Sequence, residues 1–177
     1  MDAGHRRAWF ARIAPLWVAF ALVAGCGLPG PPTPGDPDPT GPVDTTVATA
    51  LLARVNAARL AGRDCGSRGA YPPTHPLSLE PRLVLAAQAH SDDMHAHARM
   101  SHTGSDGSDP GERIRRTGYV PASWGENVAR GYVGVDEVMA GWLGSDGHCA
   151  NLMNASFTEF GGGESGRYWT QVFARPR

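Results

Sequence analysis

Apolar residues recur with helical spacing at the start of the folded part of the chain. The stretch begins near Thr45 or Thr46 and stops at Gly62. Its apolar positions fall at i, i+4, i+8 and i+11: Val47, Leu51, Val55 and Ala58. These positions form one stripe along a helix, and a glycine is the usual residue just past a helix end. The pattern therefore predicts a first helix over these residues.

Three further helices are predicted downstream. The second starts at Pro81, a residue suited to a first helical turn, and runs to about Arg99. Its apolar stripe consists of Leu83, Ala87, His90 and Met94. A short third helix is expected at Gly111–Thr117, after the capping pair Asp109-Pro110, and a fourth at Asp136–Leu143. His90 lies on the apolar stripe, so we interpret it as a core histidine with a hydrogen bond.

Strand patterns come late in the sequence. Phe157–Gly163 and Tyr168–Ala174 flank the turn-like segment 164–167, and the second of them alternates with period two. Trp124–Tyr132 is a further candidate strand. Helices come first, a small antiparallel sheet follows, and no βαβ repeat is visible. This order predicts the α+β fold class.

Residues 1–26 have the features of an export signal. Arginines are followed by an apolar run that is too short to cross a bilayer as a helix, which needs about 20 residues. The run ends in Val23-Ala24-Gly25-Cys26, which resembles the bacterial lipobox, where the cysteine is lipidated and becomes the new N-terminus. The alternative is an ordinary signal peptide with an incidental cysteine. We expect an extracytoplasmic protein anchored to the membrane through Cys26, or a secreted one if Cys26 is not lipidated.

Residues 27–43 are rich in proline, which fixes φ and removes amide donors. They are expected to form an extended linker between the anchor and a domain that spans residues 44–177. The formal net charge of the chain is −1. Because acidic and basic residues are balanced, no strong electrostatic field favours nucleic acid as a partner.

The cysteine count constrains the redox state. If Cys26 carries lipid, Cys65 and Cys149 remain, and in an oxidising compartment these two can pair only with each other. Such a bridge would close a loop of about 85 residues, worth roughly 4 kcal/mol in the chain-entropy description. Two unpaired buried thiols are the alternative.

Two histidines and one glutamate lie beside glycines and are the candidates for chemistry. His102, Glu126 and His148 offer imidazole and carboxylate groups, which are ligands for Zn²⁺ or another divalent cation. Their spacing does not match a known metal motif, and a buried hydrogen-bonded cluster is the alternative. Asp106 and Asp109 superficially suggest calcium but lack the spacing of an EF-hand, so we interpret them as part of a solvated turn.

Four motifs in order carry a family resemblance. They are SHTG at 101–104, GENVA-x-G at 125–131, W-x-x-S-x-G-H-C-x-N-x-M-N at 142–154 and YWTQVF at 168–173. Together with the two helices before them, they resemble the bacterial branch of the CAP superfamily of cysteine-rich secretory, antigen 5 and pathogenesis-related proteins. The resemblance implies an α-β-α sandwich, with a small antiparallel sheet between helical layers and a cleft on one side.

The resemblance also implies a set of cleft residues. Eukaryotic members place two histidines and two glutamates in the cleft, and His102 and Glu126 match one of each. The other two positions are Ser145 and Tyr168 in this chain, and His148 is expected to replace part of the set. Asn127 and Gln171 are expected as further neighbours of the cleft. Neutral Ser145 and Tyr168 lower the charge available to hold a cation.

Two functions follow from the resemblance. The first is a non-enzymatic binding module that holds a lipid, an envelope component or a protein. The second is a metal-assisted hydrolase acting on peptide or envelope material, with Glu126 as base and His102 and His148 as ligands. The first is favoured, because half of the eukaryotic set is absent.

Overall fold

A computed structural model of the chain describes residues 43–177 together with Met1. The predicted export signal, Cys26 and nearly all of the proline-rich linker lie outside the described residues. No helix in the described part is long and apolar enough to cross a membrane.

The helices follow the predicted pattern closely. They are α1 (Thr46–Ala61), α2 (Pro81–Ala96), α3 (Pro110–Arg116), α4 (Val135–Leu143) and α5 (Asp146–Met153), with a short 3-10 turn η1 (Gly66–Arg68). Helix α2 ends three residues earlier than predicted, because Ala98 takes a left-handed conformation with φ of 49°. Helix α5 was not predicted, since its sequence combines glycines and polar residues without a clear apolar stripe.

The strands form two sheets. Short β1 (Arg63–Asp64) and β2 (Ala70–Tyr71) pair with each other. The main sheet has the order β3-β5-β6-β4 and consists of β3 (Ser78–Leu79), β4 (Pro121–Arg130), β5 (Glu159–Ser165) and β6 (Tyr168–Pro176). Strands β5, β6 and β4 are antiparallel as predicted, whereas β3 runs parallel to β5. Two residues of β3 are too few to show a strand period in the sequence.

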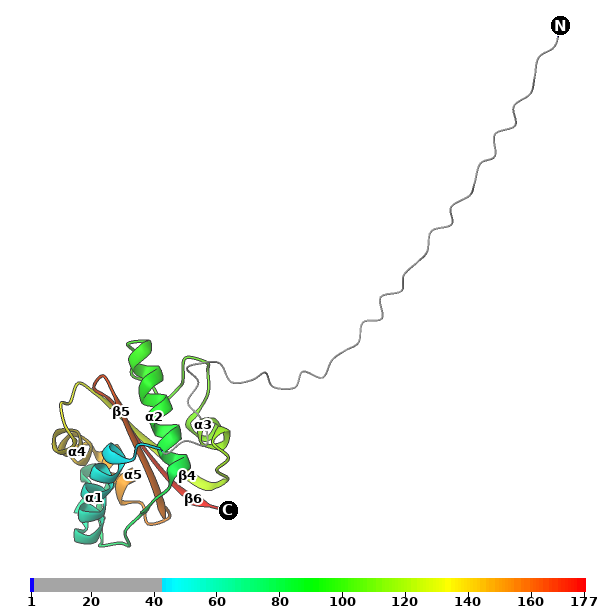
Figure 1. Ribbon diagram of the computed structural model, residues 1–177. Helices are drawn as coiled ribbons and strands as arrows, with labels where there is room; N and C mark the ends of the chain where they lie inside the picture. The colour runs from blue at the N-terminus through cyan, green and yellow to red at the C-terminus, as the bar shows by residue number, and fades with distance from the viewer. Residues whose placement is uncertain (2–42) are drawn as a thin grey trace. The chain divides into compact units, whose positions relative to one another are not determined.

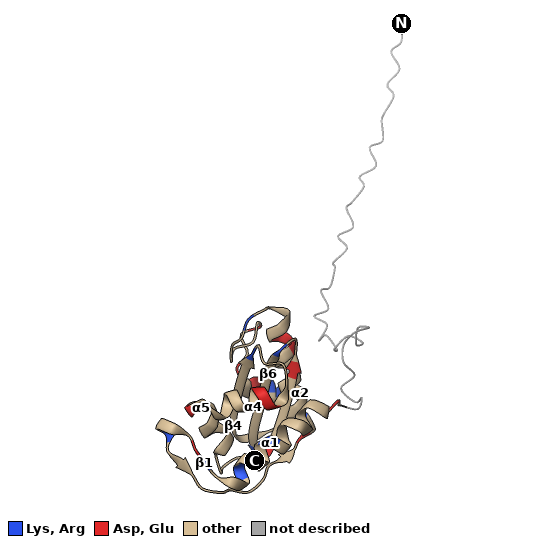
Figure 2. Cartoon of the chain, turned by 90° about the vertical axis from the view of Figure 1, so that its left-hand side faces the viewer, with Lys and Arg blue, Asp and Glu red and all other residues tan. Residues whose placement is uncertain are grey.

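The helices cover both faces of the main sheet, which confirms the α+β fold and its sandwich of layers (Figure 1). One apolar cluster joins α1, α4 and α5 to sheet residues that include Phe160, Trp169 and Phe173. A second cluster joins α2 and α3 to Val172 and Ala174. The alternation along β6 thus sends odd-numbered side chains to one layer and even-numbered ones to the other. Acidic and basic residues are spread over several elements (Figure 2).

Three consecutive glycines let both helical layers approach β5. A Cβ atom on Gly161 would lie 2.1 Å from the backbone of Leu83 in α2, and one on Gly163 would lie 2.5 Å from the backbone of Gln88. On the opposite face, a Cβ atom on Gly162 would lie 2.8 Å from Leu51 of α1. Side chains at these positions would push the layers apart, so the glycine run fixes the thickness of the sandwich.

A buried arginine ties the end of α5 to α1. Arg59 is fully buried, and its guanidinium donates hydrogen bonds to the carbonyls of Leu152, Asn154 and His75, at 2.8, 3.0 and 3.0 Å. Burial lowers the pKa of Arg59 to about 10. Since the carbonyls at a helix end carry partial negative charge, this cation holds α5 in place.

Candidate functional site

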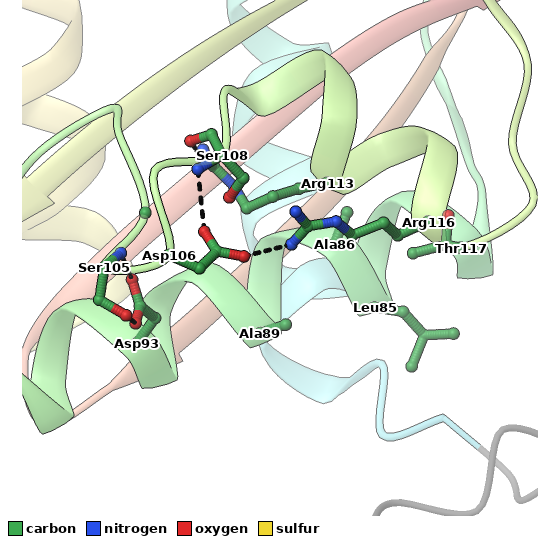
Figure 3. A pocket seen from close by; sticks show the side chains of 11 residues that line it. Leu85, Ala86, Ala89, Asp93, Ser105, Asp106, Ser108, Arg113, Arg116 and Thr117 are labelled. Atoms are coloured by element: carbon green, nitrogen blue, oxygen red, sulfur yellow. Dashed lines mark hydrogen bonds and ion pairs between the residues drawn. The ribbon is translucent and has the colours of Figure 1, made fainter. Parts of the chain in front are cut away.

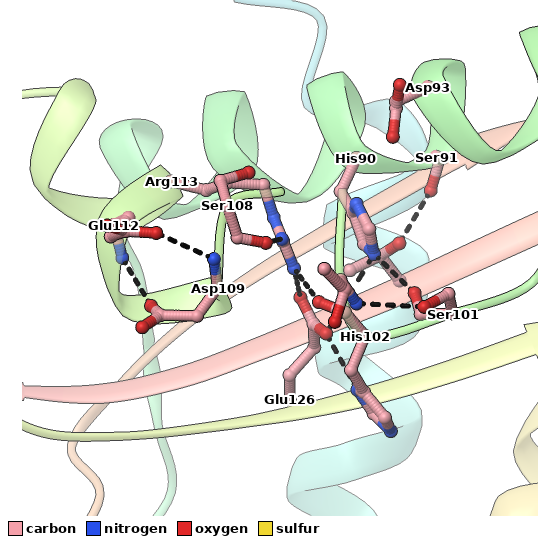
Figure 4. Close-up of polar contacts among 12 residues, drawn as sticks. His90, Ser91, Asp93, Ser101, His102, Ser108, Asp109, Glu112, Arg113 and Glu126 are labelled. Carbon is pink, nitrogen blue, oxygen red and sulfur yellow. Dashed lines mark hydrogen bonds and ion pairs between the residues drawn. The ribbon is translucent and has the colours of Figure 1, made fainter. Parts of the chain in front are cut away.

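Strand β4 carries the centre of the candidate site. Glu126 faces the α2–α3 layer, and its side chain is only 2 % exposed. Its Oε1 accepts a hydrogen bond of 2.8 Å from Nδ1 of His102, and its Oε2 accepts one of 2.7 Å from Nη2 of Arg113 (Figure 4). The structure therefore brings two of the predicted residues, His102 and Glu126, into direct contact. We call Glu126, His102, Arg113 and His90 the Glu126 cluster.

Arg113 is the residue that sequence reasoning missed. It lies on α3, whose start is fixed by a capping box between Asp109 and Glu112. The guanidinium also donates to the carbonyls of Ser108, at 2.9 Å, and His102, at 3.0 Å. A signal was present in the sequence: Arg113 falls beside Pro110 and Ile114 on the face of α3 that is buried. A charged residue on a buried helix face needs a partner, here Glu126.

His90 completes the cluster from α2. It is fully buried, and its Nε2 donates a hydrogen bond of 2.8 Å to the carbonyl of Ser101, which confirms the predicted core histidine. The same nitrogen lies 3.9 Å from Oε1 of Glu126. Burial lowers the pKa of His90. By contrast, the hydrogen bond to Glu126 raises the pKa of His102, whose side chain is 55 % exposed.

A pocket lies beside β4, and we call it the β4–α4 pocket. Its volume is about 450 Å³. It is lined by Met100, Val128, Ala129, Arg130, Gly131, Tyr132, Gly141, Trp142, Ser145 and His148. Ser145 and His148 therefore share a concave surface. Burial, and then the charge of His102, lower the pKa of His148.

The other predicted neighbours lie in the interior instead of lining this pocket. Asn127 and Gln171 are fully buried and hydrogen-bonded to each other at 3.1 Å. Asn127 also donates to the carbonyl of His148 at 3.1 Å, which holds α5 against β4. Tyr168 is 4 % exposed and packs with Met94 and Val128. These residues shape the site from behind, because strand alternation turns them into the core.

The structure does not gather the three predicted metal ligands around one point. Within the described residues, no group of three or more His, Cys, Asp or Glu side chains is placed to hold a metal ion. His102, Glu126 and His148 are thus not assembled as three ligands. Both oxygens of Glu126 are engaged by His102 and Arg113, and the guanidinium already supplies the compensating positive charge.

The predicted disulfide is present. Cys65 and Cys149 are bonded, with their Cα atoms 5.5 Å apart and a sequence separation of 84. Next to it, the carboxylate of Asp146 accepts hydrogen bonds from the backbone N–H of Ser67, at 2.9 Å, and from its hydroxyl, at 2.5 Å. The bridge and these bonds fasten the β1–β2 segment to α5, the helix that carries His148.

A second pocket lies between α2 and α3, with a volume of about 300 Å³ (Figure 3). Asp106 accepts hydrogen bonds from the N–H of Ser108, at 2.9 Å, and from Arg116, at 2.5 Å. These bonds hold the pKa of Asp106 well below its usual range. Asp109 caps α3. Both aspartates act in local hydrogen bonding, in agreement with the interpretation as a turn.

Comparison with known proteins assigns the family. The profile of the cysteine-rich secretory protein family, CAP, matches residues 52–173, and the chain belongs to this family. The Bacillus subtilis protein YkwD, described as uncharacterized, is 35 % identical over 100 residues, which cover 55 % of this chain and 39 % of that protein. The chain thus spans well under half the length of this relative.

Two solved structures share the fold. An extracellular protein containing an SCP domain from Bacillus anthracis is 26 % identical, with a TM-score of 0.61, over 77 % of this chain and 45 % of that one. An outer surface protein from Borrelia burgdorferi is 18 % identical, with a TM-score of 0.63, over 76 % of this chain and 97 % of that one. The second likeness concerns the fold alone.

Proposed function

We propose that this protein is an extracytoplasmic binding module, and that the β4–α4 pocket holds its ligand, an envelope component or another small molecule. The observation that supports this most directly is the state of Glu126. Both carboxylate oxygens accept hydrogen bonds and the side chain is buried, so a role of Glu126 as base or metal ligand would require these bonds to be broken. The adjacent pocket, in contrast, combines apolar walls with polar side chains, as ligand sites do.

The predicted export signal and the similar proteins support an extracytoplasmic location. One structural neighbour is described as extracellular and another as an outer surface protein. With a lipid on Cys26, the proline-rich linker would hold the domain away from the membrane. Labelling with an alkyne fatty acid tests the anchor: the wild type should carry the label and sediment with membranes. Cys26→Ser should lose both properties, and a label retained by that variant would refute the lipid anchor.

The binding function is tested by blocking the pocket. We expect the purified protein to retain envelope-derived small molecules that mass spectrometry detects. Ser145→Phe places a large ring in the pocket and should abolish this retention. Ala155→Phe is the matched control, because Ala155 is exposed in the turn after α5 and does not line the pocket. Equal retention by all three proteins would rule out the β4–α4 pocket as the ligand site.

The same preparations test the alternative hydrolase. If Glu126 were a base, Glu126→Gln would abolish cleavage of peptides or envelope fractions in the presence of zinc. Calorimetry with zinc on the wild type gives an independent readout. We expect no activity that depends on Glu126 and no heat of zinc binding. A zinc-dependent cleavage lost in Glu126→Gln would replace the binding module by a hydrolase.

A further inference from the structure

In the part of the chain that the structure describes, the β4–α4 pocket is lined by basic side chains and by no carboxylate. Of the described residues that line it, Arg130 and His148 carry basic side chains, and none is Asp or Glu. Glu126 shares a face of β4 with Arg130 but does not line the pocket, and its carboxylate is engaged by Arg113 and His102. The electrostatics of the pocket therefore favour a negative group over a positive one.

Arg130 supplies the permanent charge. It is the last residue of β4, and its guanidinium lies over the ring of Tyr168, 5.1 Å from the centroid. Arg130 takes part in none of the ion pairs of the described residues. Stacking on an aromatic ring orients the guanidinium while leaving its N–H donors free, and a planar guanidinium suits the two oxygens of a carboxylate.

The start of α5 adds hydrogen-bond donors on another wall. Ser145 is the N-cap residue, yet its side chain makes no capping hydrogen bond, so its hydroxyl is free to contact a ligand. His148 belongs to the first turn of the same helix. The acidic residue of this turn, Asp146, is held by Ser67. Because a helix N-terminus carries partial positive charge, it reinforces the preference set by Arg130.

The remaining walls are apolar. Met100, Tyr132 and Trp142 line the pocket, and Met100 is 50 % exposed although it is a large apolar residue. The volume of about 450 Å³ falls in the range of small-molecule sites, about 300–1,000 Å³. The pocket thus offers room for a short apolar group next to the basic side chains.

We propose that the β4–α4 pocket binds the carboxylate of a ligand that carries a short aliphatic group, with Arg130 and the Ser145 end of α5 holding the carboxylate. The apolar walls then hold the aliphatic group. This inference rests on the proposed function and names the ligand chemistry of the same pocket. Such a carboxylate belongs either to a free aliphatic acid or to the carboxyl terminus of a peptide, and the probes below separate these two sources.

Calorimetry on the full-length protein tests the charge preference with matched pairs. N-acetylleucine is compared with N-acetylleucinamide, and hexanoate with hexanamide, so that within each pair the size is similar and only the charge differs. We expect at least one acid to bind about tenfold more tightly than its amide, because a charge-assisted bond is stronger than a neutral one. A preference in the first pair indicates a peptide terminus, and one in the second indicates a free acid.

Three variants locate the contact. Arg130→Gln should weaken binding of the preferred acid about tenfold, whereas Arg63→Gln, an exposed arginine of β1 outside the pocket, should leave it unchanged. Ser145→Asp places a negative charge at the start of α5 and should abolish acid binding. Circular dichroism and thermal unfolding confirm that each variant is folded. Unchanged acid affinity in Arg130→Gln would overturn the inference.

The outcomes also separate this inference from the proposed function. Equal binding of acid and amide that Ser145→Phe abolishes would refute the charge preference and leave the pocket as a binding site. Failure of both acids to bind at millimolar concentration would refute the inference, while retention of envelope molecules by the wild type, lost in Ser145→Phe, would still support the binding module. If neither acid binds and the wild type retains no envelope molecule, both proposals are refuted.

Discussion

Two regions along strand β4, its middle and its end, treat polar side chains in opposite ways. In the Glu126 cluster, the carboxylate is buried and each of its oxygens accepts a hydrogen bond. At the end of the strand, Arg130 lines an open pocket together with Ser145 of α5; Arg130 makes no ion pair among the described residues and Ser145 no capping bond. Buried charges require partners, whereas polar groups at a pocket can leave their bonds to water or a ligand. The comparison suggests that the cluster mainly maintains structure and the pocket mainly binds.

The largest expected effect concerns the disulfide that fastens α5, a wall of the pocket. Replacing Cys65 and Cys149 by serine should lower the free energy of unfolding by about 4–5 kcal/mol, because the bridge closes a long loop in the unfolded chain. Urea unfolding measures the difference, and wild type unfolded under reducing conditions should match the double variant. A loss below about 1 kcal/mol would show that the other contacts of α5 suffice.

Removing the cation of the Glu126 cluster should lower the free energy of unfolding slightly less than removing the disulfide does. Arg113→Met leaves Glu126 buried without its guanidinium, and we expect a loss of about 3–4 kcal/mol in urea unfolding. Arg115→Met, an exposed change on the same helix, should stay within about 0.5 kcal/mol of wild type. If Arg113→Met is as stable as this control, the cluster is not a structural element, and the contrast with the pocket disappears.

The N-terminal caps of α3 and α5 should differ in how much each stabilises the fold, and this effect is smaller. Asp109→Ala removes the capping box of α3 and should cost about 1 kcal/mol in thermal or urea unfolding. Ser145→Ala at the start of α5 should cost less than about 0.5 kcal/mol, because the serine side chain makes no capping bond. Equal losses would mean that Ser145 stabilises α5 after all and is not free to contact a ligand.

The smallest expected effect concerns the pKa values of three histidines. Histidine titrations followed by NMR should place the pKa of His102 above its ordinary value of 6.5 and those of His90 and His148 below it. A raised pKa means that His102 stabilises the fold at low pH and loses this contribution as pH rises through its folded-state pKa. His90 and His148 act in the opposite sense, destabilising the fold as pH falls below 6.5.

The variant Glu126→Gln sharpens this measurement. It removes the charge that raises the pKa of His102, so the titration of His102 should move down toward its ordinary value. No movement of His102 would contradict the hydrogen bond between the two side chains.

Much of the fold was determined by local sequence. Helices α1 to α4 and the β5–β6 hairpin were predicted because apolar spacing, first-turn prolines and glycines act within a few residues. The hairpin turn confirms this: Gly166 and Arg167 both take positive φ, within the segment predicted to turn. The pairing of Cys65 with Cys149 could be inferred by counting, once Cys26 was assigned to the export signal.

The site depended on tertiary structure. The sequence named His102, Glu126, Ser145 and His148, but it could not show that β4 separates them into a bonded cluster and an open pocket. That division depends on which elements pack beside each part of the strand and on the partner that each brings, such as Arg113 from α3. Contacts between distant segments are set by packing of the layers, and no local pattern encodes them.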